Sequence, residues 1–171
     1  MRTGLLGALG VLLVTGCASS PPMRFYTLSA VAPASATAEA IRVGRVRIPA
    51  ELDRTEIVQR VDANRLSIAE LDQWAAPMED MIRRVLTADL SGQGQAPATV
   101  NVDIEEFMGD ASCNVTLTAS WELKSANSNA PVTGRESIRV PGSGSNCTAS
   151  SLPMPMSQAL AQLSEKIRAA R

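Results

Sequence analysis

Four acidic residues stand close together in the second half of the 171-residue chain. Asp103, Glu105, Glu106 and Asp110 form its densest group of side chains that could do acid–base chemistry, because paired carboxylates are the groups that glycosidases use as acid and base. In a strand, however, alternate residues share a face, so Asp103 and Glu105 both lie opposite Ile104. This alternation favours a solvated, charged face over a catalytic pair.

The chain contains no histidine. Histidine is the usual base in Ser–His and Cys–His sites and a common metal ligand, so the sequence argues against those chemistries. Ser143 and Ser145 lie in a Gly/Ser-rich segment and have no histidine to activate them. We therefore expect no catalytic residue, no cofactor and no metal site, and we predict that the protein is not an enzyme.

The first of the three cysteines offers a different chemistry. Cys17 follows Val14-Thr15-Gly16, and these four residues resemble the bacterial lipobox, in which the thiol forms a thioether to diacylglycerol. Before them stand a cationic start at Arg2 and a mostly apolar run from Gly4 to Val14, which is too short to span a bilayer. We expect residues 1–16 to be a removable signal peptide and Cys17 to be lipidated with diacylglycerol and palmitate; an ordinary N-terminal helix is the alternative.

The other two cysteines, Cys113 and Cys147, lie in the part of the chain that the signal peptide is expected to export. Two thiols in an oxidising compartment favour one disulfide. This disulfide would close a loop of 147 − 113 = 34 residues, and for that length the chain-entropy estimate of the stabilisation of the fold is about 4 kcal/mol. Two separately buried thiols are the alternative, and two thiols without histidine fall short of the four ligands of a structural zinc site.

Composition limits the class of partner. The formal net charge is −1 and aromatic residues make up 3% of the chain. Because there is no basic run, nucleic acid is not an expected partner.

Residues 24–171 have the length of one domain, and residues 17–23 form a lipidated tether in front of it. The six residues from Ala18 to Met23 reach about 20 Å when fully extended, so the domain must stay close to its membrane.

Periodicity predicts the elements that position these residues. Residues 29–39 lack large apolar side chains and read as a loop. Period-two alternation predicts strands, and helical spacing after a proline predicts two helices. The strands are predicted at 24–28, 41–48 with a bulge at Gly44, 57–61, 66–68, 100–108, 115–123 and 132–140, and the helices at 77–90 and 155–167. Strands, helix, strands, helix is the order typical of an α+β fold, so we expect a mostly antiparallel sheet with both helices on one face.

Two apolar groups could serve as contact surfaces. Trp74 and Met78 flank Pro77 and could form a groove for lipid, because methionine adapts to irregular apolar shapes; packing under the first helix is the favoured alternative. Met154 and Met156 lie on a proline-stiffened segment before the last helix. They could form a partner surface or simply pack as the helix begins.

With these residues laid out, the chain resembles the PqiC-like, ABC-type transport auxiliary lipoprotein family. The resemblance follows the order and spacing of short segments. These are Phe25-Tyr26-Thr27-Leu28, Ile41 to Ile48-Pro49, Leu52-Asp53-Arg54, Ile57-Val58, Asn64-Arg65-Leu66, Trp74-Ala75-Ala76-Pro77-Met78 and the final Ala159 to Ser164. Thr55, where a proline is common, and Met78, where a leucine is usual, depart from the pattern.

The resemblance implies a non-enzymatic outer-membrane component of a lipid-transport system. In such systems a periplasm-spanning MCE-family protein is the partner, and the lipoprotein docks its far end and supports membrane integrity; homo-oligomers are possible. Ala18, rather than aspartate, after Cys17 is what an outer-membrane location would show. A periplasmic carrier for a lipid or small apolar ligand is the alternative, and it predicts an apolar cavity in the monomer.

Overall fold

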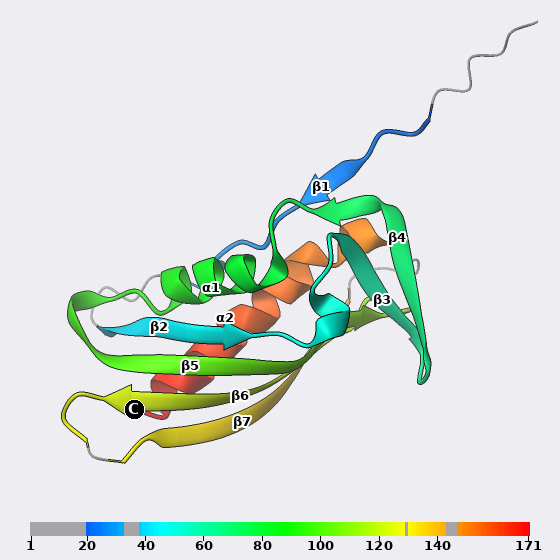
Figure 1. Ribbon diagram of the computed structural model, residues 1–171. Coiled ribbons are helices and arrows are strands. Elements are labelled where there is room, and N and C mark those ends of the chain that lie inside the picture. The colour runs from blue at the N-terminus through cyan, green and yellow to red at the C-terminus, as the bar shows by residue number, and fades with distance from the viewer. Residues whose placement is uncertain (1–19, 33–37, 129, 143–146) are drawn as a thin grey trace, which may run out of the picture.

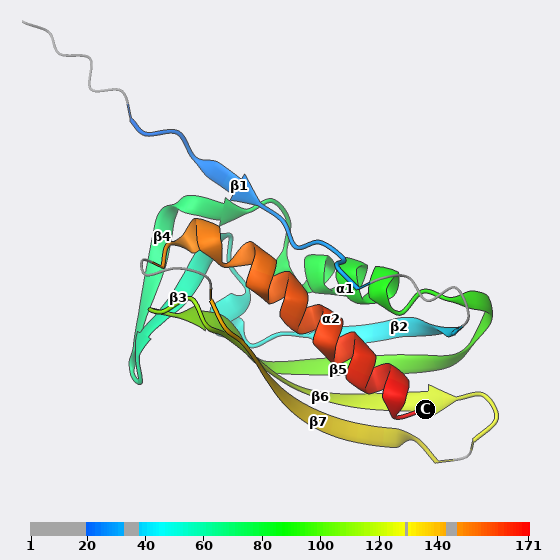
Figure 2. The ribbon, with the colours of Figure 1, turned by 180° about the vertical axis from the view of Figure 1, so that it is seen from behind.

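The protein is a mixed β-sheet with its two longer helices on one face, as Figures 1 and 2 show. The computed structural model describes residues 20–32, 38–128, 130–142 and 147–171. Residues 1–19, including the predicted signal peptide and Cys17, and also Ser143 and Ser145, lie outside the described residues. None of the helices in the described part is long and apolar enough to cross a membrane.

Seven strands form one sheet within the described ranges. They are β1 (Arg24–Tyr26), β2 (Glu39–Arg47), β3 (Glu56–Asp62), β4 (Arg65–Trp74), β5 (Gln93–Asp110), β6 (Val115–Ser125) and β7 (Val132–Val140). The helices are α1 (Met78–Asp89) and α2 (Pro153–Ala169), with short 3-10 turns η1 (Ala50–Leu52) and η2 (Ala149–Ser151). The strand order is β1-β4-β3-β5-β6-β7, and β2 pairs with β5.

The long strand β5 organises this sheet. Along one edge it pairs antiparallel with β6 from Ala98 to Gly109. Its other edge is shared: β2 pairs in parallel with its first part and β3 pairs in parallel at Gly109 and Asp110. The register of β2 against β5 shifts between Val43 and Val46, which confirms the bulge predicted at Gly44.

The half of the molecule formed by β5, β6, β7 and α2, which we call the sheet half, is regular. Its inward residues belong to one buried cluster with the apolar stripe of α2, and Figure 2 shows α2 lying diagonally across the three strands. The opposite face carries ion pairs, among them Arg135–Glu105 at 2.7 Å and Lys124–Glu122 at 3.1 Å. One face is therefore core and the other is solvated, as the alternation predicted.

The predicted α+β class with two main helices is confirmed, and the structure refines the sheet. The sheet is mixed: β3–β4, β5–β6 and β6–β7 are antiparallel, whereas β1–β4, β2–β5 and β3–β5 are parallel. Strand β5 begins at Gln93, earlier than predicted, and α2 begins at Pro153. The β1 strand is only three residues long.

Cys113 and Cys147 form a disulfide, with their Cα atoms 5.1 Å apart, which confirms the predicted bridge. Cys113 sits in the tight turn between β5 and β6. The carboxylate of Asp110 holds this turn by accepting hydrogen bonds from the backbone amides of Ser112 (2.8 Å) and Asn114 (3.0 Å). The bridge ties this turn to the segment that leads into η2 and α2.

Candidate functional site

Segments far apart in the sequence meet at one end of the sheet. We call this end the anchor pole: it consists of Arg24–Tyr26, Ala50–Thr55 and Trp74–Pro77. Strand β1 pairs with the last residues of β4, with Tyr26 opposite Trp74. The amide of Ala75 donates to the carbonyl of Tyr26 at 2.8 Å, and the amide of Trp74 donates to the carbonyl of Thr55 at 2.6 Å. Main-chain hydrogen bonds thus join all three segments.

A hollow of about 400 Å³ opens on the surface of the anchor pole. Its lining consists of Asp53, Arg54, Thr55, Trp74, Ala75, Ala76 and Pro77. The Trp74 side chain is only 5% exposed, so the indole forms a firm wall of the hollow. A second hollow of about 370 Å³ shares Asp53 with the first, and it is lined by Arg47, Ile48, Ala50, Asp53 and Glu79.

The charges around the two hollows are mostly paired. Arg54 lies 3.3 Å from the Glu56 carboxylate. The pKa of the Glu56 carboxyl is lowered, chiefly by a hydrogen bond from the backbone amide of Glu56 itself and next by the hydrogen bond from Arg54. Glu79 pairs with Arg83, whose other nitrogen donates to the Gly44 carbonyl at 2.6 Å. Helix α1 begins after Pro77 without a side-chain cap.

A buried carboxylate fastens β1 to β4. Asp72 accepts two hydrogen bonds from Arg24, at 2.7 and 2.8 Å, and one from the Tyr26 hydroxyl at 2.8 Å. The hydrogen bond from Arg24 is the main cause that lowers the pKa of the Asp72 carboxyl. The same carboxylate raises the pKa of Tyr26. This contact, which we call the Asp72 latch, fastens the strand that follows the tether to β4.

The structure separates the four candidate contact residues. Trp74 and Met78 are buried, and Met78, the first residue of α1, packs in the core. Met154 is 59% exposed on the first turn of α2, whereas Met156 is 3% exposed. Trp74 borders the first hollow, so it can touch a ligand there, and Met154 can touch a partner. Met78 and Met156 serve packing.

The acidic residues in the second half of the chain behave as the alternation predicted. Asp103 lies 3.7 Å from Arg47, Glu105 2.7 Å from Arg135 and Glu106 3.0 Å from Arg60. Asp110 lies 3.1 Å from Arg139. Each carboxylate therefore faces an arginine on the solvated side of the sheet. In the described ranges there is also no group of three or more side chains suited to hold a metal ion.

The family model of the ABC-type transport auxiliary lipoprotein component matches residues 26–168. The chain belongs to this family. Among curated relatives, it is 27% identical over 135 residues to the intermembrane transport lipoprotein PqiC of Escherichia coli (strain K12), and the match covers 69% of this chain and 72% of that protein. The protein of the same name from Shigella flexneri matches equally.

Solved structures support the fold. One crystal structure of an uncharacterised protein has a TM-score of 0.70 at 18% identity, covering 87% of this chain and 98% of that one. A protein from Xanthomonas campestris has a TM-score of 0.65 at 15% identity, covering 84% and 91%. The two-layer arrangement of sheet and helices is therefore shared with these proteins.

Sequence reasoning offered a groove beside Trp74 and Met78 as one of two alternatives, and the structure shows a hollow that Trp74 borders and Met78 does not. The sequence reasoning singled out Trp74 but not Asp53, Arg54, Thr55 or Ala75, which line the hollow with it. The family-like segments at 52–54 and 74–78 indicate this region, because they lie at the end of η1 and between β4 and α1 rather than in the sheet half. Only the three-dimensional structure shows that they border the same space.

Proposed function

We propose that this protein is an outer-membrane lipoprotein, anchored through Cys17, that docks the far end of an MCE-family protein in an intermembrane lipid-transport system. Family membership makes it a transport auxiliary lipoprotein. The relative from E. coli is named as an intermembrane transport lipoprotein. The observation that carries the docking role is the hollow of the anchor pole, where the family-like segments at 52–54 and 74–78 meet.

The short tether determines how docking works. A domain held within about 20 Å of its membrane cannot cross the periplasm. The partner must therefore do the reaching, and this protein supplies a fixed surface near the outer membrane. Two features of that surface suit a protein partner: the hollow, walled by Trp74, and the exposed Met154. An exposed methionine adapts to the shape of an apolar partner.

The docking experiment is periplasmic crosslinking to the MCE protein, with single substitutions compared at equal expression. Ala75→Trp fills the hollow and Met154→Glu charges the exposed methionine; both positions are exposed, so folding is retained. We expect each to reduce capture about tenfold, the effect of losing ~1.4 kcal/mol of binding. Met156→Glu is avoided because that side chain is buried.

The matched control is Ala126→Trp, an exposed alanine just after β6. It adds the same side chain at the opposite end of the sheet and should leave capture unchanged. If Ala75→Trp and Met154→Glu also capture normally, these two surfaces are not the interface. If wild-type protein captures no MCE protein, the docking function is wrong.

The hollow also favours a second candidate, a carrier of lipid or another small apolar ligand. Its volume of about 400 Å³ falls in the range of about 300–1,000 Å³ that is common for ligand pockets. Mass spectrometry of lipid extracted from protein purified in mild detergent separates the two. Docking predicts only the anchor lipid; carriage predicts a further bound lipid that Ala75→Trp removes and Ala126→Trp retains.

A further inference from the structure

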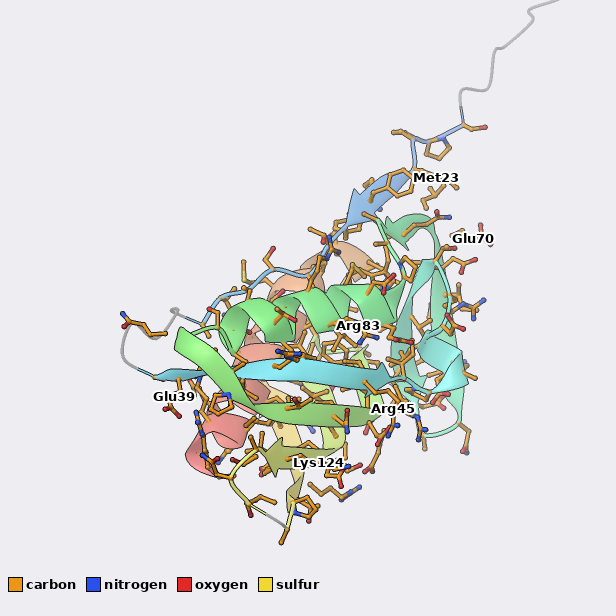
Figure 3. The ribbon with its side chains drawn as sticks, turned by 60° about the vertical axis from the view of Figure 1, so that its left-hand side comes forward. Met23, Glu39, Arg45, Glu70, Arg83 and Lys124 are labelled. Atoms are coloured by element: carbon orange, nitrogen blue, oxygen red, sulfur yellow. A yellow bond between two sulfur atoms is a disulfide. The ribbon has the colours of Figure 1, made fainter. Side chains whose placement is uncertain are left out.

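Two large apolar side chains stand exposed where the chain joins the tether. Phe25 in β1 is 62% exposed and Met23, just before it, is 52% exposed. Figure 3 shows Met23 where the chain leaves the folded body. Among the large apolar side chains of the described residues, Phe25 is the most exposed, and Met23 lies only two residues before it.

Pairing makes the β1–β4 ribbon two-faced. Arg24 and Tyr26 both reach Asp72, so their side chains point to one face. Side chains alternate along a strand, so Phe25 points to the other face, together with its cross-strand partner Gln73. The Asp72 latch thereby fixes the direction of Phe25. A rigid strand, rather than a loose tail, presents this ring to its surroundings.

The length of the tether identifies what lies against that face. Only six residues separate Cys17 from β1, and Pro21 and Pro22 are two of them; six residues reach at most about 20 Å. We propose that Met23 and Phe25 rest on the membrane that holds the lipid anchor, and so orient the domain with the Phe25 face of the β1–β4 ribbon against the bilayer. This inference rests on the proposed anchor at Cys17.

The contact is shallow. Glu70 is exposed on β4 two residues before Asp72. An ionised carboxylate does not enter the hydrocarbon core. Arg24 brings no unpaired charge, because it is bound to Asp72. The aromatic ring and the thioether therefore sit at the boundary between headgroups and acyl chains, where amphipathic and aromatic side chains gather.

The test uses the lipidated, processed protein in phosphatidylethanolamine–phosphatidylglycerol vesicles, with bromine on the acyl chains near the headgroups. Phe25→Trp places a fluorophore at the predicted contact. Val132→Trp is the matched control, because Val132 is also exposed (44%) and begins β7 at the far end of the sheet. The native Trp74 and Trp121 are buried and serve as a common background in both variants.

We expect bromine to quench the added emission of Phe25→Trp about twofold and to leave that of Val132→Trp unchanged, as for a ring at the lipid interface. Equal quenching of the two variants, or none at either, would overturn the membrane contact. Blue-shifted but unquenched emission from the indole of the Phe25→Trp variant would also overturn it, since the ring would then lie against protein. Intact mass and flotation with the vesicles check the anchor separately: protein without diacylglycerol that fails to float would refute the anchor and the contact that rests on it.

Discussion

The sheet half and the anchor pole are built on opposite principles. In the sheet half, long antiparallel ladders pair β5 with β6 and β6 with β7, and one continuous face is covered by α2. At the anchor pole, β1 contributes three residues, main-chain hydrogen bonds join three short segments, and a hollow stays open beside Trp74. The two regions therefore treat their apolar side chains differently: the sheet half buries most of them, and the anchor pole displays some of them.

Removing the disulfide tests how much the bridge between the β5–β6 turn and the start of α2 stabilises the sheet half. In the Cys113→Ser, Cys147→Ser double variant we expect the free energy of unfolding to fall by about 4 kcal/mol, because the unfolded chain regains the freedom of a loop spanning 34 residues. Urea unfolding measures this loss. Wild type with the bond reduced is the control for the substitutions. A loss shared by both samples would confirm the bridge as the cause, and an unchanged midpoint would contradict it.

Truncating the core probes the sheet half alone. Leu163 on α2 is fully buried, so Leu163→Ala should cost about 3 kcal/mol through lost burial and the cavity left behind. Met154→Ala on the same helix removes an exposed side chain and should change stability by less than about 0.5 kcal/mol. Thermal and urea unfolding compare the two. Similar losses for both would break the division of roles between the regions.

Adding one methyl group tests how tightly the sheet half is packed. Gly134 in β7 pairs with Trp121 in β6, and a Cβ atom at this glycine would lie 2.3 Å from the indole ring. Gly134→Ala should therefore destabilise the protein by about 2 kcal/mol, as overpacking does. Thr133→Ala, one residue earlier and exposed, is the control. An unfolding midpoint that does not move would show that Trp121 has room to shift.

The smallest effect is expected at the Asp72 latch, and it depends on pH. Because the pKa of Asp72 is lowered in the folded protein, the contribution of this carboxylate is present above its ordinary pKa of about 3.9 and is lost as the pH falls through the lowered value. Asp72→Asn should remove that pH dependence. Hydrogen exchange is measured at β1 and at the Ala75 amide from neutral to acid pH. In the variant these amides should be less protected than in wild type already at neutral pH, whereas in wild type they should lose protection only in acid. Exchange in β6 should be the same in both. Equal opening in wild type and variant would refute the latch.

Side-chain patterns predicted the sheet half well and the anchor pole poorly. The strand at 115–123 and the last helix repeat their apolar residues at the periods of a strand and a helix, so their side chains reveal them. The early part of β5, Gln93 to Pro97, carries few large apolar side chains and is held by main-chain pairing, as is Glu39 opposite Gln93. Backbone pairing leaves no side-chain pattern.

The anchor pole was predicted only in pieces for the same reason. The pairing of Tyr26 with Trp74 and the hydrogen bond between Trp74 and Thr55 are main-chain contacts between distant segments. Neither hydrophobic periodicity nor turn chemistry encodes which segments will meet. Met156 illustrates the remaining difficulty: it differs from Met154 by two residues, and the start of α2 at Pro153 turns one side chain outward and the other into the core.

The parallel pairing of β1 with β4 has a mechanical consequence. When a partner pulls the domain away from the membrane along the direction of β1, the force enters through the tether and runs along that strand. The hydrogen bonds between β1 and β4 lie across this direction, so the pull shears them together instead of opening them one at a time. The two hydrogen bonds from Arg24 to Asp72 resist the same sliding motion. A strand of only three residues can thus keep the domain attached to its tether under tension.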